Sequence, residues 1–271
     1  MSKEKEVAIV EENKISEATN DALRSLMSAD TEEYQDDTNM GDLQIPRLKI
    51  LQAMSPELQK ANVSKYVEGT EAGDLFNTLT QKTIRGDEGL LFVPIKRRVI
   101  YLEWKGTDGK GVLVNNYEED DSAFHEATIN KEGLHISKTG NNIVKTYETL
   151  GFVIDIENKD FQTIMISMSK TQTKKMKKFN SLIRLLQDPV TKKQFPEYAG
   201  VYKITSIIES NDHGSWFNYE IDFKYKLDAP ELKGLGSIIY NKAKELRESY
   251  QTVSYKTNYK EEEPIEVSEK I

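Results

Sequence analysis

Six cationic side chains stand in one stretch of 16 residues, from Ser169 to Arg184, and no acidic residue interrupts them. They are Lys170, Lys174, Lys175, Lys177, Lys178 and Arg184. The chain as a whole is acidic, with 45 Asp and Glu residues against 37 Lys and Arg residues. A purely basic window in an acidic protein indicates a surface that attracts a polyanion, and nucleic-acid phosphate is the commonest one. A solvated helix face is the alternative interpretation.

The same window has the hydrophobic period of an amphipathic helix over residues 169–187. Apolar residues recur at intervals of three and four, at Met176, Phe179, Leu182, Ile183 and Leu186. Ser169 suits the N-cap, and Asp188-Pro189 ends the helix. Lysines in the first turns oppose the helix dipole, whereas the free amide groups there favour anions. A bound phosphate would therefore offset the unfavourable interaction between these lysines and the helix dipole.

Binding of single-stranded nucleic acid also needs aromatic platforms, and each stacked base contributes about 1–3 kcal/mol. Trp216 follows a predicted turn, on the strand face opposite Phe217, Tyr219, Ile221 and Phe223. It shares that face with Asn218, Glu220 and Asp222. We expect Trp216 to stack on a base, with covering of a sheet edge as its alternative role. Trp104, which ends a predicted strand beside a glycine-rich loop, is the second candidate, with core packing as its alternative.

A second basic cluster, Lys96-Arg97-Arg98, follows Pro94 in a strand-like segment. Strand alternation puts Arg97 on one face and its two neighbours on the other. Arg97 is therefore a candidate phosphate contact. The alternative is an edge strand whose cations are solvated.

Signals for catalysis and for metal binding are weak. The absence of cysteine excludes disulfides and thiolate zinc sites, and the three histidines lack metal-ligand spacing. The chain contains neither a GxxxxGK(S/T) phosphate loop nor an HExxH motif. We therefore expect a protein that is not an enzyme and uses no cofactor or metal.

Acidic residues concentrate at the two ends of the chain. Between Met1 and Asp42 stand twelve acidic and four basic residues, a difference equal to the formal net charge of −8 for the whole chain. From Lys256 onward there are five acidic and three basic residues. We predict an acidic, largely disordered arm at 1–44, a single nucleic-acid-binding domain at 45–255 and a flexible acidic tail at 256–271.

No apolar run approaches the roughly 20 residues of a membrane span, and the N-terminal segment lacks the apolar core of a signal peptide. We expect no membrane association and a cytosolic location.

Strand-like segments dominate the central domain. They are 75–80, 90–104, 147–156, 161–168, 198–209 and 215–223, with hairpin turns at 157–160 and 210–214. Residues 115–142 are expected to form an irregular insertion, and helices are expected at 16–28, from Ser55, at 169–187 and at 230–250. Strands, a helix and two final strands follow the order of an OB-fold, so we predict an α+β protein with a five-stranded OB-like barrel, an inserted helix and a C-terminal helix. An α+β sheet with helices on one side is the alternative.

Three blocks of the sequence resemble blocks in a group of bacteriophage proteins. They run from Ile45 to Pro56, from Gly73 to Asn77 and from Glu209 to Asn218, within residues 44–250. The group is similar to phage single-stranded DNA-binding proteins with an OB-fold, including those of short-tailed phages. The resemblance implies a protein that coats replication and recombination intermediates in the cytoplasm of an infected bacterial host. It also implies recruitment of replication proteins through the acidic tail, although this chain ends in Glu269-Lys270-Ile271 and lacks the terminal aromatic residue of the better-known members.

The leading hypothesis is a phage single-stranded DNA-binding protein, for which both a monomer and a homo-oligomer stay open. In this hypothesis Lys174, Lys175, Lys177, Lys178 and Arg184 contact phosphates, and Trp216 and Trp104 stack on bases. Two alternatives stay open. A virion or assembly protein would dock its basic helix on an acidic partner, and an inhibitor would use the acidic residues 1–42 as a DNA mimic.

Overall fold

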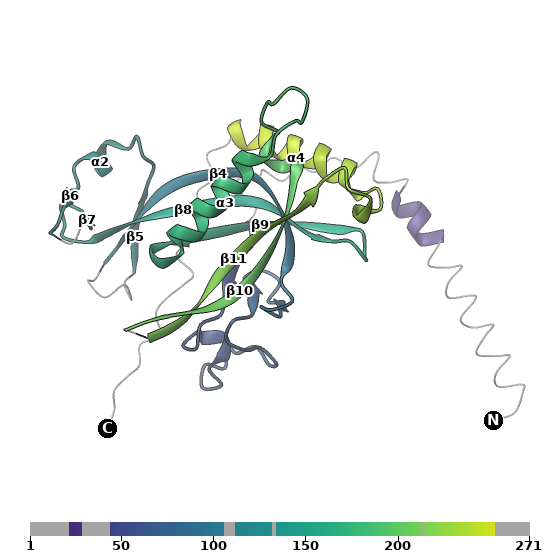
Figure 1. The fold of residues 1–271 in the computed structure, drawn as a ribbon. Coiled ribbons are helices and arrows are strands. Elements are labelled where there is room, and N and C mark those ends of the chain that lie inside the picture. The colour runs from purple at the N-terminus through teal and green to yellow at the C-terminus, as the bar shows by residue number, and fades with distance from the viewer. Residues whose placement is uncertain (1–21, 29–43, 106–111, 132–133, 213, 253–271) are drawn as a thin grey trace, which may run out of the picture. The chain divides into compact units, whose positions relative to one another are not determined.

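The computed structural model describes residues 22–28, 44–105, 112–131, 134–212 and 214–252 (Figure 1). The chain divides into two compact units, Met1–Leu43 and Gln44–Ile271. In the first unit, residues 22–28 form a helix within the segment predicted to be helical. The acidic tail predicted at 256–271 and most of the predicted acidic arm lie outside the described residues.

The second unit is mainly β, with one curled half-barrel sheet (Figure 1). Its strands are β1 (Arg47–Ile50), β2 (Leu75–Asn77), β3 (Thr83–Ile84), β4 (Leu90–Trp104), β5 (Leu113–Tyr117), β6 (Thr128–Ile129), β7 (His135–Ile136), β8 (Asn142–Asp155), β9 (Asp160–Ser169), β10 (Gly200–Asn211) and β11 (Gly214–Lys226). The main path of the sheet runs β11-β10-β4-β8-β9-β1-β2-β3. The β1–β9 pair is parallel, and the other pairs of the main path are antiparallel.

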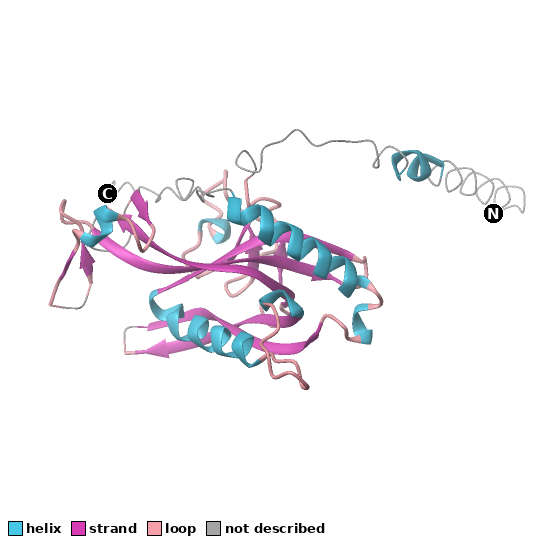
Figure 2. Ribbon diagram, turned by 90° about the horizontal axis from the view of Figure 1, so that it is seen from above, coloured by secondary structure: helices cyan, strands magenta, loops and turns pink. Residues whose placement is uncertain are grey.

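Two long helices cover the sheet from opposite sides (Figure 2). They are α3 (Thr173–Leu185) and α4 (Leu235–Thr252), and a short helix, α2 (Ser122–His125), lies between β5 and β6. Three-residue 3-10 helices are η2 (Pro56–Leu58), η3 (Lys170–Gln172), η4 (Glu197–Ala199) and η5 (Pro230–Leu232). The predicted α+β class, mainly β with helices, is therefore confirmed.

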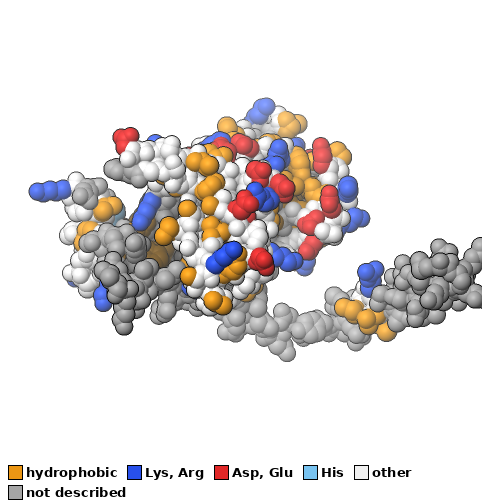
Figure 3. Space-filling view, turned by 90° about the horizontal axis from the view of Figure 1, so that it is seen from below, with side chains coloured by type: hydrophobic (Ala, Val, Ile, Leu, Met, Phe, Trp, Pro, Cys, Tyr) orange, Lys and Arg blue, Asp and Glu red, His pale blue; other side chains and the backbone are white. Residues whose placement is uncertain are grey.

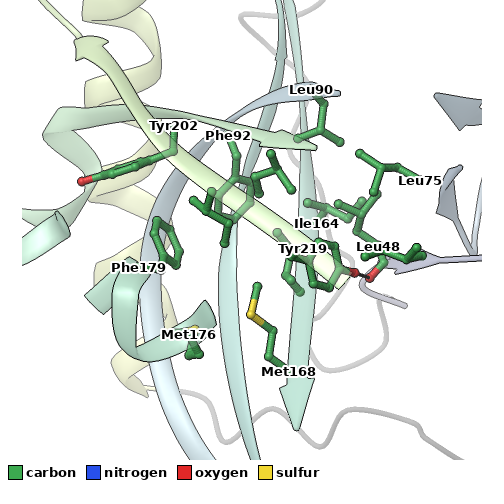
Figure 4. Packing of buried hydrophobic residues seen from close by; sticks show 14 of the residues in the cluster. Leu48, Leu75, Leu90, Phe92, Ile164, Met168, Met176, Phe179, Tyr202 and Tyr219 are labelled. Carbon is green, nitrogen blue, oxygen red and sulfur yellow. Dashed lines mark hydrogen bonds between the residues drawn. The ribbon is translucent and has the colours of Figure 1, made fainter. Parts of the chain in front are cut away.

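Strand β4 separates two hydrophobic cores because its side chains alternate between the faces of the sheet. Leu90 and Phe92 join the α3 core, which we define as the cluster that contains Met176, Phe179 and Ile183 of α3 (Figure 4). Val93 and Ile95 join the α4 core, which contains Leu235, Ile239 and Ala243 of α4. Each helix thus buries one apolar stripe, as its hydrophobic period predicts.

Hydrogen bonds from side chains connect β11, at one end of the curled sheet, to the region of β1. The Gln52 amide both donates to the Phe217 carbonyl and accepts from the Phe217 N–H, each at 2.9 Å. The Tyr219 hydroxyl donates to the Leu48 carbonyl at 3.0 Å (Figure 4). Together they join the β1 region to β11, two segments that no strand pairing among the described residues connects.

Most of the predicted elements are confirmed. Strand β4 has its predicted bounds, and the hairpins β8–β9 and β10–β11 form across the predicted turns. The C-terminal helix is interrupted after η5, where Lys233 and Gly234 adopt positive φ angles of 49° and 85°. The helix expected from Ser55 is only the single turn η2, in which the Ser55 hydroxyl accepts from the Gln52 N–H instead of capping the helix.

The prediction of an irregular insertion at 115–142 is wrong. This segment contains most of β5 together with α2, β6 and β7, and it extends the sheet beside the ends of β4 and β8. Its strands have two to five residues, too few for hydrophobic alternation to be visible in the sequence. Pairing of β5 with β4 and of β7 with β8 determines the structure of this segment, which its local sequence pattern does not predict.

A candidate nucleic-acid interface

Eleven of the 13 residues of α3 fall into three stripes of helical spacing. Met176, Phe179 and Ile183 are buried in the α3 core. Lys175, Lys178, Leu182 and Leu185 form a second stripe, which we call the β11 flank because its two lysines contact β11. Lys174, Lys177, Ser181 and Arg184 form the third stripe, and all four are exposed, so we call it the exposed stripe.

The exposed stripe carries cations that no carboxylate of the described residues neutralises. Within the described part of the chain, no carboxylate lies within ion-pair distance of Lys174, Lys177 or Arg184. Lys170 is also exposed, in η3 just before α3, with a positive φ of 49°. Four of the predicted phosphate contacts are therefore accessible to an anion from solution: Lys170, Lys174, Lys177 and Arg184.

The lysines of the β11 flank instead bind carboxylates of the β10–β11 hairpin. Lys175 Nζ lies 2.6 Å from Glu220 and 3.1 Å from Glu209. Lys178 pairs with the same Glu220 and lies 3.2 Å from Asp222. Two of the six cations in the basic window therefore attach α3 to the sheet. Figure 3 shows a face of the molecule on which basic and acidic side chains likewise lie side by side.

The pKa of Glu220 reflects this arrangement. Burial raises the pKa of Glu220, but hydrogen bonds and charge from Lys175 and Lys178 outweigh burial and hold the pKa below its ordinary value. The pKa of Glu209 is also lowered, first by the hydrogen bond from the Asn218 amide and then by Lys175 and Trp216. Both carboxylates are therefore more acidic in the folded protein than in an unfolded chain.

We expect Glu220→Gln to destabilise the protein at neutral pH and to have a smaller effect in acid. A lowered folded pKa contributes stability above the unfolded pKa of about 4.3, and this contribution is lost as pH falls through the folded pKa. The expected cost at pH 7 is about 1.5 kcal/mol, the lower range for hydrogen bonds to a charged group. Urea denaturation of both proteins from pH 7 to pH 3 measures the difference. An equal effect at all pH values would contradict the assignment, and Glu88→Gln in an exposed loop is the control.

Arg97 lies away from the exposed stripe, on β4. Its Nε donates to Glu197 at 2.6 Å, and its Nη1 donates to Asn180 of α3 at 2.5 Å. Glu197 also accepts from Arg247 of α4, whose Nη1 donates to the Ile95 carbonyl at 2.6 Å. Arg97 therefore belongs to a network that joins both long helices to the sheet.

The two tryptophans have different surroundings. Trp216 is half-buried on β11 opposite Glu209 of β10, and its indole nitrogen is buried beside the Glu209 carboxylate. Since Glu209 also pairs with Lys175, the structure brings Trp216 close to α3. Trp104 packs with Ile100, Leu102 and Leu113 in a separate small cluster. The structure thus associates only Trp216 with the basic helix.

Two groups of residues at this interface were missed by the sequence interpretation. The first is the set of acidic partners Glu209, Glu220 and Asp222. Strand alternation had put Glu220 and Asp222 on the polar face of their strand. That pattern could have indicated them as partners for Lys175 and Lys178. The second is Phe223, which was expected beside the buried Tyr219 and Ile221 but is 41% exposed.

The described residues contain no group of His, Asp and Glu that could hold a metal ion, and no helix among them is long and apolar enough to cross a membrane.

The protein is mainly β, with a curled half-barrel sheet and a basic helix of which two lysines are paired with carboxylates of β10 and β11. The family model of the Pam3 phage gp34-like protein matches residues 15–256, which is most of the chain. The chain belongs to this phage protein family. Searches of curated proteins and of solved structures found no match.

Proposed function

We propose that this protein binds single-stranded DNA in the cytoplasm of an infected bacterial host, and that its curled sheet is an OB-like barrel. The observation that supports this best is the exposed stripe of α3. Cations within ion-pair reach of acidic residues are common on protein surfaces, whereas Lys174, Lys177 and Arg184 have no such partner among the described residues. Phosphates spaced along a nucleic-acid strand match a row of cations on a helix.

The phage family membership fits a role in DNA metabolism, and the connection of β11 to the β1 region fits a barrel that closes through side chains. Coating of replication and recombination intermediates, and recruitment of replication proteins through residues 256–271, belong to the same proposal. A virion protein that docks on an acidic partner, or a DNA-mimic inhibitor, would replace it if DNA binding fails.

The test is fluorescence anisotropy of the full-length protein with labelled oligo-dT and with a duplex of the same length, over a series of salt concentrations. We expect tighter binding to the single strand, with a logarithmic salt slope of about −0.7 for each phosphate contact. Absence of binding to either probe at low salt would reject the proposal. Equal binding to both probes would reject its preference for single strands.

A further inference from the structure

One aromatic ring beside α3 is accessible enough to stack on a base. Among the described aromatic side chains, Phe223 of β11 and Tyr240 of α4 are the most exposed, at 41% and 37%. All other described tryptophan, tyrosine and phenylalanine side chains are buried or half-buried, Trp216 and Trp104 included. Tyr240 lies on α4, which covers the face of the sheet opposite α3, whereas Phe223 lies on β11, whose Glu220 and Asp222 pair with lysines of α3.

The ion pairs of the β11 flank give the register of α3 along β11. Lys175 pairs with Glu220, and Lys178, one turn later, pairs with both Glu220 and Asp222, so the helix and the strand advance in the same direction. A helix rises about 1.5 Å per residue and a strand about 3.3 Å. Leu182, four residues after Lys178, is therefore level with the strand about two residues after Asp222. This register puts the part of β11 that includes Phe223 at about the level of Leu182, in the last turns of α3.

Contacts between aromatic rings also connect Phe223 to α3, and they hold the Phe223 ring in place. Phe223 packs edge-on against Tyr202, with ring centroids 5.7 Å apart and planes at 72°. Tyr202 is fully buried and packs edge-on against Phe179 of α3, at 5.0 Å and 83°. The exposed ring thus rests on a buried ring that α3 itself holds, so little conformational entropy is lost when a base stacks on it.

We propose that Phe223 is the residue on which a nucleobase of the bound single strand stacks, with the phosphates of that strand on the neighbouring cations of α3. This inference rests on the proposed function and names the base-contacting residue within it. The cations of α3 closest to the level of Leu182 along the helix are Arg184 on the exposed stripe and Lys178, which is 44% exposed on the β11 flank. Stacking on Phe223 would be tolerant of sequence because every base has a π face.

The experiment compares Phe223→Ala with Tyr240→Ala in oligo-dT binding by the full-length protein. Tyr240 is a matched control because it is similarly exposed and also packs edge-on against a buried tyrosine, Tyr198, at 5.1 Å. We expect Phe223→Ala to weaken binding about 5- to 150-fold, the range that corresponds to one stacked base. The salt slope should stay unchanged, because a ring contributes no phosphate contact. Tyr240→Ala should bind as the wild type does.

Two further measurements separate stacking from folding. Phe223→Leu keeps apolar contact with Tyr202 but lacks a ring, so we expect it to keep the wild-type urea midpoint and to lose affinity nearly as Phe223→Ala does. Photocrosslinking of oligo-dT that contains 5-iododeoxyuridine, followed by mass spectrometry, should modify Phe223. Wild-type affinity in both Phe223 variants, or crosslinks at Trp216 or Trp104 alone, would overturn the inference and leave the proposed function standing. Failure of the wild-type protein to bind oligo-dT would overturn both.

Discussion

Replacement of Lys174 and Lys177 by glutamate is expected to weaken oligo-dT binding by at least about 25-fold at 0.1 M salt. Each phosphate contact makes the logarithm of the binding constant fall by about 0.7 per tenfold increase in salt. Two lost contacts therefore flatten the logarithmic salt slope by about 1.4, which corresponds to about 25-fold at 0.1 M salt relative to 1 M salt. Repulsion between the new carboxylates and phosphate adds to the loss. Both lysines lie on the exposed stripe, where neither has an ion-pair partner among the described residues, so we expect little change in stability.

The matched control is Lys242→Glu with Lys244→Glu. These lysines are also exposed on a helix, but they lie on α4, on the other side of the sheet (Figure 2). They are two positions apart rather than three, and Lys242 pairs with the exposed Glu245 at 2.9 Å. The control makes the same change in net charge, so it separates a local contact from long-range electrostatic attraction. If both double variants bind equally weakly, the loss comes from net charge and the exposed stripe is not the binding surface.

Replacement of Phe179 by alanine is expected to destabilise the protein by about 3–5 kcal/mol, a large part of the stability of about 5–15 kcal/mol that is usual for a domain. Phe179 is 1% exposed and packs against Phe92 of β4 and Tyr202 of β10, with ring centroids 6.5 Å and 5.0 Å apart (Figure 4). Its removal leaves a cavity between α3 and the sheet. The free energy of unfolding from urea denaturation, monitored by circular dichroism, measures the loss.

The control for this substitution is Leu185→Ala on the same helix. Leu185 is 74% exposed, so we expect a change within about 0.5 kcal/mol. Similar losses in the two variants would show that helix propensity, and not the α3 core, determines the stability of this region. A Phe179→Ala protein with wild-type stability would contradict the packing of α3 on the sheet.

Local sequence patterns were sufficient to predict the elements that carry the candidate site. The period of Met176, Phe179 and Ile183 predicts α3 and its buried stripe, because helix geometry repeats every 3.6 residues whatever the rest of the chain does. Alternation together with turn residues likewise predicts the β10–β11 hairpin. The short strands between β5 and β8 could not be predicted in this way, because pairing with β4 and β8 determines them.

The composition of the basic window was evident from the sequence, but the roles of its cations were not. The sequence determined that six cations lie on or just before one amphipathic helix of a phage-like protein. Only the tertiary structure decided that Lys175 and Lys178 bind carboxylates while Lys174 and Lys177 remain exposed. The physical reason is that Glu220 and Asp222 are more than 40 residues away along the chain, and the packing of α3 against β11 brings them within reach.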